Sequence, residues 1–228
     1  MKENKTELIT YLEQFVSERR LQRFEEVLSH RTSHMHVVLE NIFQAHNASA
    51  VLRSCDCFGI QHVHFIENRN RLRISEEVAM GSSSWLTIHR HNEQENNTVA
   101  ALSRLRSEGF RIVVTSPHKK GYTPATLPAD KKFALVFGTE LEGVSQKALE
   151  MADDFLSLPM FGFTESFNVS VCAALCMYDL SRRIRTEVPG WELEAAEREA
   201  VYYSWLLASI DHSEAIVKDF LQKKKIGG

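Results

Sequence analysis

Short apolar runs alternate with segments of helical periodicity through the middle of the chain. The runs are rich in β-branched residues and end in turn residues, as strands do, and they lie at residues 37–39, 63–66, 85–88, 112–114, 134–137 and 155–158. Helical patterns separate most of them, at residues 48–58, 95–108, 145–152 and 167–184. This alternation predicts an α/β fold with a mostly parallel sheet and helices on both faces.

The expected helix ends follow from individual residues. Asn47 is the type of residue that caps a helix N-terminus, and we expect it to begin the helix over residues 48–58. Gly59 and Gly109 follow the first and second helical patterns, where a left-handed residue commonly ends a helix.

Both ends of the chain differ from this middle. Residues 3–30 have the pattern of one or two amphipathic helices, and residues 191–222 that of a helical pair broken near Asp211. Pro189-Gly190 marks a boundary before the second set. We therefore expect an N-terminal helical arm over residues 1–36, a core domain over 37–186 and a C-terminal helical arm over 187–228.

Composition narrows the class of protein. The 228 residues are 43% hydrophobic and 25% charged, which excludes a disordered chain and a small disulfide-rich scaffold. The net charge of −3 neither indicates nor excludes a nucleic-acid partner, since a local basic patch is sufficient. The four cysteines form no CxxC pair and the histidines show no ligand spacing, so we expect no metal.

The cellular setting is predicted from two further observations. The N-terminus lacks an apolar signal core, and the apolar stretch 155–178 is broken by Pro159 and Gly162. We expect no membrane segment and a cytoplasmic protein with reduced cysteines.

Three segments follow predicted strands and carry polar residues. They are residues 40–53, 137–143 and 158–171. Taken singly, each has a simple structural interpretation, as a capped helix with a surface arginine, a tight glycine-bracketed turn and a second helix cap. Because ligands bind outside the carboxyl ends of parallel strands, we expect the three segments to converge at one rim of the sheet.

In this order the segments closely resemble the signature motifs of the SpoU/TrmH family of SPOUT methyltransferases. Asn47…Arg53 resembles motif one, Gly138-Thr-Glu-Leu-Glu-Gly143 motif two, and Leu158-Pro-Met…Ser166-Phe-Asn168-Val-Ser motif three. The resemblance covers about residues 37–181. Phe167 stands where the family usually has leucine, Thr139 where asparagine or glutamine is common, and Ala45 where proline is frequent.

The resemblance implies a fold, a cofactor and a reaction. The fold would be an α/β domain with a C-terminal trefoil knot, a topology that is essentially absent from ordinary folds, and it would form a homodimer whose site is completed across the interface. The helical arms extend the similarity to the branch that methylates a ribose 2′-hydroxyl in tRNA, with a D-loop guanosine as the expected target. The cofactor would be S-adenosylmethionine, bound by Thr115, Gly138, Leu158, Met160 and Phe167.

The resemblance also assigns catalytic residues. Arg53 would be the central one, and because a guanidinium stays protonated we favour a bidentate clamp on a phosphate and the developing oxyanion over a general base. Asn47 would position Arg53 or the ribose, and Glu140 would hold the motif-two loop through backbone amides. Ser166 and Asn168 would hold the third loop and the substrate hydroxyl. The proton acceptor stays open.

Basic residues outside the motifs are candidates for RNA contacts, with a solvated surface as the alternative. They are Arg19, Arg20, Arg23, Arg31, His118, Lys119 and Lys120. Alternative functions are the same reaction on ribosomal RNA, a non-catalytic RNA-binding protein that kept the fold, and an unrelated α/β nucleotide enzyme.

Overall fold

The computed structural model describes residues 2–69 and 81–226, and the chain forms two compact units. One unit spans Arg31–Glu192, and the other combines the described residues up to His30 with those from Leu193 onward. The boundaries expected after residues 36 and 186 both fall inside the larger unit. The first strand already begins at Met35 and the last helix of the unit runs to Glu187, so the unit needs the flanking residues.

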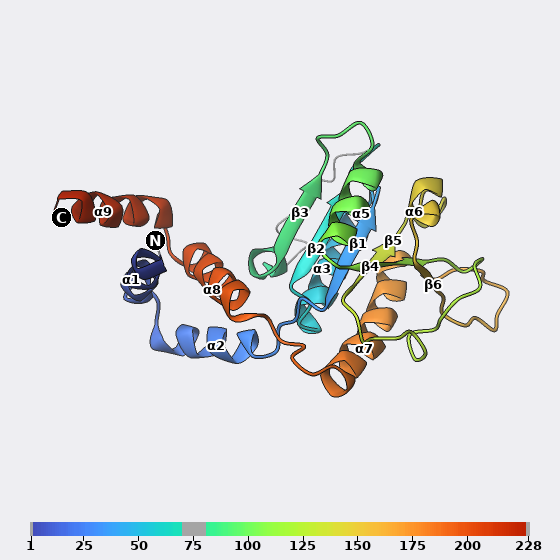
Figure 1. The fold of residues 1–228 in the computed structure, drawn as a ribbon, viewed down its shortest axis with the longest axis horizontal. Coiled ribbons are helices and arrows are strands. Elements are labelled where there is room, and N and C mark those ends of the chain that lie inside the picture. The colour runs from blue at the N-terminus through green and yellow to red at the C-terminus, as the bar shows by residue number, and fades with distance from the viewer. Residues whose placement is uncertain (1, 70–80, 227–228) are drawn as a thin grey trace. The chain divides into compact units, whose positions relative to one another are not determined.

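The larger unit is built on a parallel sheet, shown in Figure 1. Within the described residues the strand order is β3-β2-β1-β5-β4-β6, and every neighbouring pair is parallel. The strands are β1 (Met35–Glu40), β2 (His62–Ile66), β3 (Thr87–His91), β4 (Arg111–Thr115), β5 (Phe133–Phe137) and β6 (Asp154–Leu156). All six predicted strands are confirmed. The third begins two residues late, because Ser82–Trp85 form the 3₁₀ turn η1.

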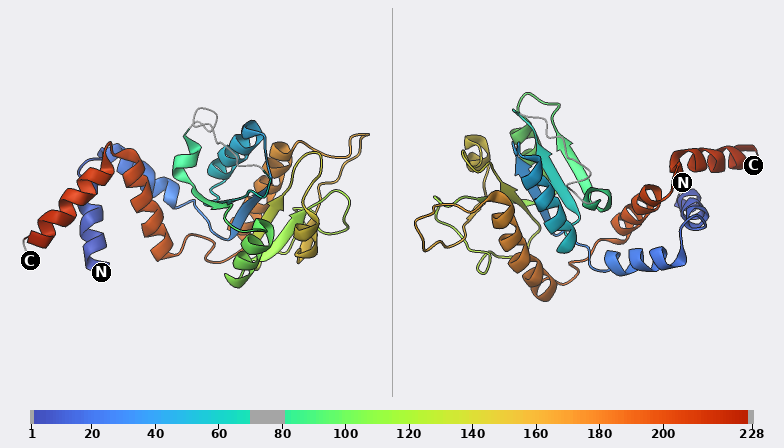
Figure 2. Two further views of the ribbon diagram at one scale, coloured as in Figure 1. Left: turned by 90° about the horizontal axis from the view of Figure 1, so that it is seen from above. Right: turned by 180° about the vertical axis from the view of Figure 1, so that it is seen from behind.

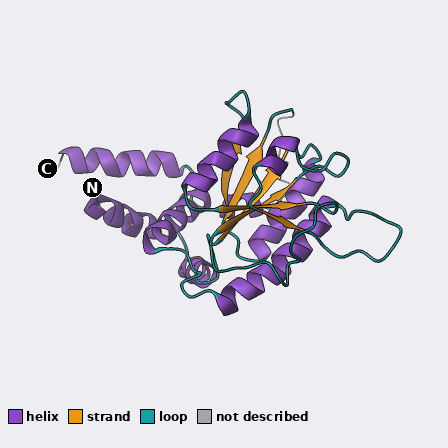
Figure 3. Ribbon diagram, turned by 45° about the vertical axis from the view of Figure 1, so that its right-hand side comes forward, coloured by secondary structure: helices purple, strands orange, loops and turns teal. Residues whose placement is uncertain are grey.

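Helices cover both faces of the sheet, as predicted and as Figure 3 shows. Successive strand residues point to opposite faces, so Val37 joins the core beneath α3 (Ala45–Cys57) and α7 (Val169–Glu187). Val38 joins the core beneath α5 (Asn97–Ser107) and α6 (Gln146–Glu150). Strands β1 and β5 are buried along their whole length. This is expected of central strands in a parallel sheet covered on both sides.

The helix ends differ from the prediction at one important residue. Gln44 occupies the cap position of α3, so Asn47 lies in the first turn and its assignment as the N-cap is wrong. Asn168 caps α7, whose first residue is Val169 rather than the expected residue 167. Gly59 and Gly109 end their helices with φ of 73° and 90°, as predicted.

The smaller unit consists of helices from both ends of the chain, drawn in blue and red in Figures 1 and 2. They are α1 (Lys2–Glu13), α2 (Glu18–Leu28), α8 (Ala195–Ser209) and α9 (Ser213–Ile226). The region for which one or two helices were predicted thus holds two, and the pair predicted over residues 191–222 is present. Phe24 packs edge-on against Trp205, with ring centroids 5.5 Å apart, and Tyr11 packs on Phe220 at 5.0 Å. None of the helices among the described residues has the length and apolar character needed to cross a membrane.

Five histidines of β1, β2 and β3 form a hydrogen-bonded ladder, which we call the histidine ladder: His36, His62, His64, His89 and His91. His64 bonds His36 on one side and His91 on the other, and His62 bonds His89, each at 3.0 Å between ring nitrogens. The rings also stack; those of His64 and His89 are 4.3 Å apart at 11°. No group of three or more side chains in the described ranges is arranged to hold a metal ion.

Burial sets the charge state of these rings. Desolvation is the main cause that lowers the pKa of His64 to about 2 and that of His89 to about 4, and the neighbouring imidazoles add to it. His36 and His91 also have lowered pKa values for the same first reason. His36, His64, His89 and His91 are therefore neutral, and in a neutral ring one nitrogen donates and the other accepts.

Candidate active site

A cluster of three side chains joins the three motif segments. Asn47 of α3 donates through Nδ2 to Oε1 of Glu140, at 2.9 Å, and Asn168 donates through Nδ2 to the same carboxylate oxygen. Asn168 Nδ2 also lies 3.3 Å from Oδ1 of Asn47. These segments are far apart in sequence, so the expected convergence at one rim of the sheet is confirmed.

The orientation of both amides is fixed by neighbouring groups. Asn168 Oδ1 accepts from the backbone N–H of Ser170, at 2.9 Å, and from its hydroxyl, at 2.5 Å, so its Nδ2 must face Glu140. Asn47 uses its remaining N–H on Gln44 Oε1, at 2.7 Å. A carboxylate accepting from two amides is thus held between two helix starts. The Glu140 carboxylate accepts from these two side chains, whereas we expected it to hold the motif-two loop through backbone amides.

The motif-two turn explains the need for glycine at residue 138. Thr139 and Gly143 exchange backbone hydrogen bonds of 2.9 and 3.0 Å and close a tight turn, with Gly143 at φ 68°. A Cβ at residue 138 would lie 2.1 Å from the carbonyl of Gly143. Only glycine therefore allows the strand to pass this close to the end of its own turn.

Glu40, at the end of β1, anchors the neighbouring elements. Its buried carboxylate accepts from the N–H and the hydroxyl of Ser145, at 2.7 and 2.6 Å, and from the hydroxyl of Thr98, at 2.5 Å. Thr98 is the second residue of α5 and Ser145 caps α6, so one carboxylate positions the starts of two helices at the carboxyl edge of the sheet. Glu40 lies in the first motif segment, and the sequence predicts no role for it.

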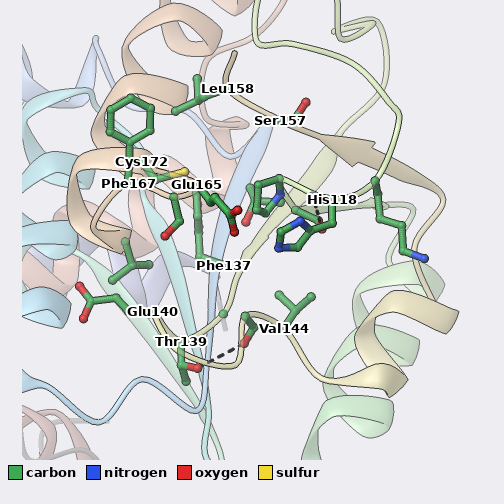
Figure 4. A pocket seen from close by; sticks show the side chains of 18 of the residues that line it. His118, Phe137, Thr139, Glu140, Val144, Ser157, Leu158, Glu165, Phe167 and Cys172 are labelled. Carbon is green, nitrogen blue, oxygen red and sulfur yellow. Dashed lines mark hydrogen bonds between the residues drawn. The ribbon is translucent and has the colours of Figure 1, made fainter. Parts of the chain in front are cut away.

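A cavity of about 420 Å³ opens beside the cluster, between the ends of β4 and β5 and the start of α7, as Figure 4 shows. All five predicted cofactor residues line it: Thr115, Gly138, Leu158, Met160 and Phe167. Glu140, Glu165 and Ser166 add polar groups to its wall, and His118 and Lys119 lie along another part of it. The volume falls in the range of small-molecule sites, which are mostly apolar with few polar groups.

The predicted catalytic residues do not all meet. Asn47, Glu140 and Asn168 are joined, and Ser166 lines the cavity beside them. Arg53 is exposed on α3 and is not among the residues that line the cavity. Arg53 lies six positions after Asn47, so its side chain is rotated about 240° around the helix from that of Asn47.

The predicted RNA contacts divide into two groups. Arg19, Arg20, Arg23, Lys119 and Lys120 are exposed. Arg31 is 1% exposed and forms an ion pair with Asp56 inside the larger unit, so its assignment as an RNA contact is wrong. A buried charge is retained only with a partner, and this arginine holds the start of the larger unit to α3.

Comparisons with known proteins agree with this geometry. The model of the SpoU rRNA Methylase family matches residues 34–178. A tRNA (guanosine(18)-2′-O)-methyltransferase of Borreliella burgdorferi is 36% identical over 92% of this chain and 95% of the relative. An Aquifex aeolicus protein of the same name is 34% identical over 75% of this chain and 80% of its own length.

Solved structures show the same similarity. The A. aeolicus TrmH/SpoU tRNA modifying enzyme superposes with a TM-score of 0.75 at 29% identity, covering 85% of this chain and 98% of that one. A SpoU methyltransferase of Streptomyces viridochromogenes, AviRb in complex with the cofactor AdoMet, shares the fold with a TM-score of 0.58 at 20% identity, over 72% of this chain and 62% of that one. With the motif residues clustered beside one cavity, the chain belongs to the SpoU methylase family.

Proposed function

We propose that this chain transfers a methyl group from S-adenosylmethionine to the 2′-hydroxyl of a guanosine ribose in tRNA, at position 18 as in the names of its relatives. The observation that carries the proposal is the contact of Asn47, Glu140 and Asn168 beside the cavity. Three segments that have separate structural explanations form one polar constellation, next to space for a small molecule. Relatives that match over most of their length are named for this reaction.

The residues of the cavity fit the cofactor. Leu158, Met160 and Phe167 offer apolar surface for an adenine ring, and the loops around Gly138 offer backbone N–H and C=O groups. The hydroxyl of Thr115 donates to the carbonyl of Val136 at 2.9 Å, which leaves its methyl group for contact. When bound, the cofactor supplies an electrophilic methyl group on a sulfonium.

The chain's own residues then align the nucleophile. Ser166 at the cavity wall hydrogen-bonds the ribose hydroxyl, while the Glu140 carboxylate keeps both asparagines in one orientation. Alignment of this kind accelerates a reaction by removing the entropy of encounter. Arg53 clamps the phosphate and the developing oxyanion.

We infer that Arg53 acts in the site of a second copy of the chain, since its helix turns it away from its own Asn47. The homodimer has a surface to form on. Val171, Leu175 and Tyr178 lie at helical spacing on α7 and are 46%, 44% and 61% exposed. Such an apolar stripe is typical of an interface. We also propose that the larger unit contains the trefoil knot of the family's fold. Because the proposed substrate is tRNA in the cytoplasm, we propose that the protein is cytoplasmic.

The exposed basic residues supply the proposed RNA contacts. Arg19, Arg20 and Arg23 are exposed on α2. Lys119 lines the cavity, and Lys120, which follows it in the chain, is also exposed. Phosphate contacts release counterions, so we expect RNA affinity to fall steeply as salt rises.

The test is methyl transfer from radiolabelled S-adenosylmethionine to unmodified tRNA and, separately, to ribosomal RNA, followed by nucleoside analysis. We expect label in 2′-O-methylguanosine from tRNA. An Arg53→Ala variant should lose transfer, while Arg104→Ala, at an exposed arginine on α5, is the matched control. Label only in ribosomal RNA would show that the substrate is ribosomal RNA and not tRNA. Cofactor binding without transfer to either RNA would favour a non-catalytic RNA-binding protein.

A further inference from the structure

The loop between β6 and α7 exposes two phenylalanine rings. Phe161 is 97% exposed and Phe163 is completely exposed, whereas Val171, Leu175 and Tyr178 of α7 are only about half exposed. Figures 1 and 2 show residues 157–168 extending away from the sheet. Neighbouring large apolar side chains that stay in water are characteristic of a binding surface.

The same loop forms part of the cavity wall. Met160, directly before Phe161, and Glu165, two residues after Phe163, both line the cavity. Leu141 of the motif-two turn lines it as well and is 91% exposed. Among the described residues no other large apolar side chain is more than 90% exposed. The strongest apolar exposure is therefore concentrated on two loops that border the cavity.

Charged side chains indicate what kind of group each part of the border can bind. His118 and Lys119 line the cavity from the loop after β4, and Glu165 lines it from the loop of the phenylalanines. Figure 4 shows Glu165 and His118 facing the same space from these two loops. Lysine attracts a phosphate and a carboxylate repels it, whereas the N–H groups on a base edge are donors that a carboxylate accepts.

The other carboxylates of the wall already have partners. Glu140 accepts from Asn47 and Asn168, and Glu142 forms an ion pair with Arg69. The exposed carboxylate of Glu165 is thus the acceptor on this wall that a ligand can use. The charges favour RNA backbone on the lysine side of the cavity and a base on the phenylalanine side.

We propose that Phe161 and Phe163 hold the base of the target guanosine by stacking, while Glu165 accepts from the N–H groups on its pairing edge. The inference rests on the proposed function, which brings the ribose of that nucleotide into the cavity. The base is attached to the same ribose and must lie at the cavity border. A nucleotide that reaches into an active site leaves the base stack of its RNA, and aromatic side chains replace the stacking that it loses.

A second copy of the chain is the alternative partner for these rings. The half-exposed stripe of α7 is the surface proposed for that copy. The loop differs from the stripe because Glu165 stands beside its rings, and the buried centre of a protein interface is depleted of charged residues. The composition of the loop therefore favours a nucleobase.

The experiment measures RNA binding by the full chain saturated with S-adenosylhomocysteine. Two labelled tRNAs are compared: the unmodified tRNA, and the same tRNA lacking only the base of guanosine 18, so that both keep the ribose 2′-hydroxyl. The variants are Phe161→Ala, Phe163→Ala and Glu165→Gln. Val99→Ala, at an exposed apolar residue of α5, is the matched control.

We expect each alanine variant of the two phenylalanines to bind the intact tRNA at least about tenfold more weakly, an effect of about 1.4 kcal/mol or more, and Val99→Ala to bind as the unchanged chain does. Removal of the base should weaken binding by the unchanged chain at least about tenfold. It should weaken binding by the phenylalanine variants about twofold or less, because ring and base are partners in one contact. Glu165→Gln should weaken binding of the intact tRNA alone, and Phe163→Tyr, which keeps a flat ring, should retain the affinity.

Three results would overturn the inference. Equal losses for both tRNAs would mean that the rings act on another part of the RNA. Loss of S-adenosylhomocysteine binding in the variants, measured by calorimetry, would assign the rings to the cofactor. Monomeric variants of a chain that is otherwise dimeric in sedimentation would assign them to the subunit interface. Methyl transfer by the unchanged chain tests the proposed function separately: its absence would overturn both, whereas transfer together with full RNA affinity in the variants would overturn the inference alone.

Discussion

The histidine ladder makes the stability of the larger unit depend on pH. The rings of His64 and His89 are neutral in the folded chain, because burial lowers the pKa of His64 to about 2 and of His89 to about 4, whereas an unfolded histidine titrates near 6.5. The ladder's contribution is fully present above the unfolded pKa. It is lost as the pH falls from about 6.5 toward the folded values, because the unfolded chain then binds protons that the folded chain excludes.

The magnitude follows from the size of this window. For each ring, the free energy of unfolding falls by about 1.4 kcal/mol per pH unit within this window. A change from pH 6.5 to pH 5 therefore lowers it by about 2 kcal/mol for each of His64 and His89. Both together approach about 4 kcal/mol, a large part of a typical domain's stability. The charged groups facing the ladder do not reverse the sign. Arg104 of α5 lowers the pKa of His64 and His89, Glu108 raises that of His89 by a lesser effect, and Lys132 before β5 lowers that of His36.

Urea unfolding between pH 7.5 and pH 5 measures the effect. We compare the unchanged chain with a His64→Gln, His89→Gln double variant, which keeps polar side chains and removes two titrating rings. Below pH 6.5 the free energy of unfolding should fall less steeply with pH in the double variant than in the unchanged chain. The difference in slope should reach up to about 2.8 kcal/mol per pH unit, which corresponds to two protons. A His46→Gln variant controls for loss of an exposed histidine outside the ladder. An unchanged slope in the double variant would refute the reasoning.

Three further predictions concern the candidate active site and the proposed interface. Asn168→Asp places a second carboxylate against Glu140 and should lower kcat/KM in the methyl-transfer assay by about tenfold or more, whereas binding of S-adenosylhomocysteine should persist. Gly138→Ala forces a Cβ into the backbone that closes the turn and should cost about 2 kcal/mol or more in urea unfolding. At Gly162 an added Cβ makes only an ordinary contact, 4.0 Å from the backbone nitrogen of Thr164, so Gly162→Ala serves as the control. Leu175→Asp puts a charge into the exposed stripe of α7 and should yield monomers in sedimentation analysis; a dimer that persists would contradict the proposed interface.

The sequence predicted the sheet well because parallel strands covered on both faces are recognisable as apolar runs. Phe133–Phe137 is such a run and is buried at every residue. The convergence of Glu140 and Asn168 was also predictable, since both follow strands whose carboxyl ends share an edge. The prediction failed at Asn47, because a good capping residue was read as a cap while the helix begins two residues before it.

Other features depend on strand register, which the sequence does not display. His62-Val-His64 and His89-Arg-His91 alternate and so place two rings each on one face, a readable signal. That His62 pairs with Thr87 and His64 with His89 is fixed by the assembled sheet. The burial of Arg31 depends in the same way on tertiary packing against Asp56, and no local pattern distinguishes it from Arg23.

The strand order has a consequence for how the protein folds. β1 pairs with β5, so that Met35 lies beside Phe133. All the residues between these two strands must be synthesised before the strands can pair. Contacts of such long sequence separation carry a high loop-closure entropy and slow folding. During synthesis β1 and β2 leave the ribosome first, with one apolar edge of β1 unpaired until β5 arrives. The cluster of Asn47, Glu140 and Asn168 therefore assembles late in folding. Until then the unpaired edge of β1 is a site at which the nascent chain can aggregate.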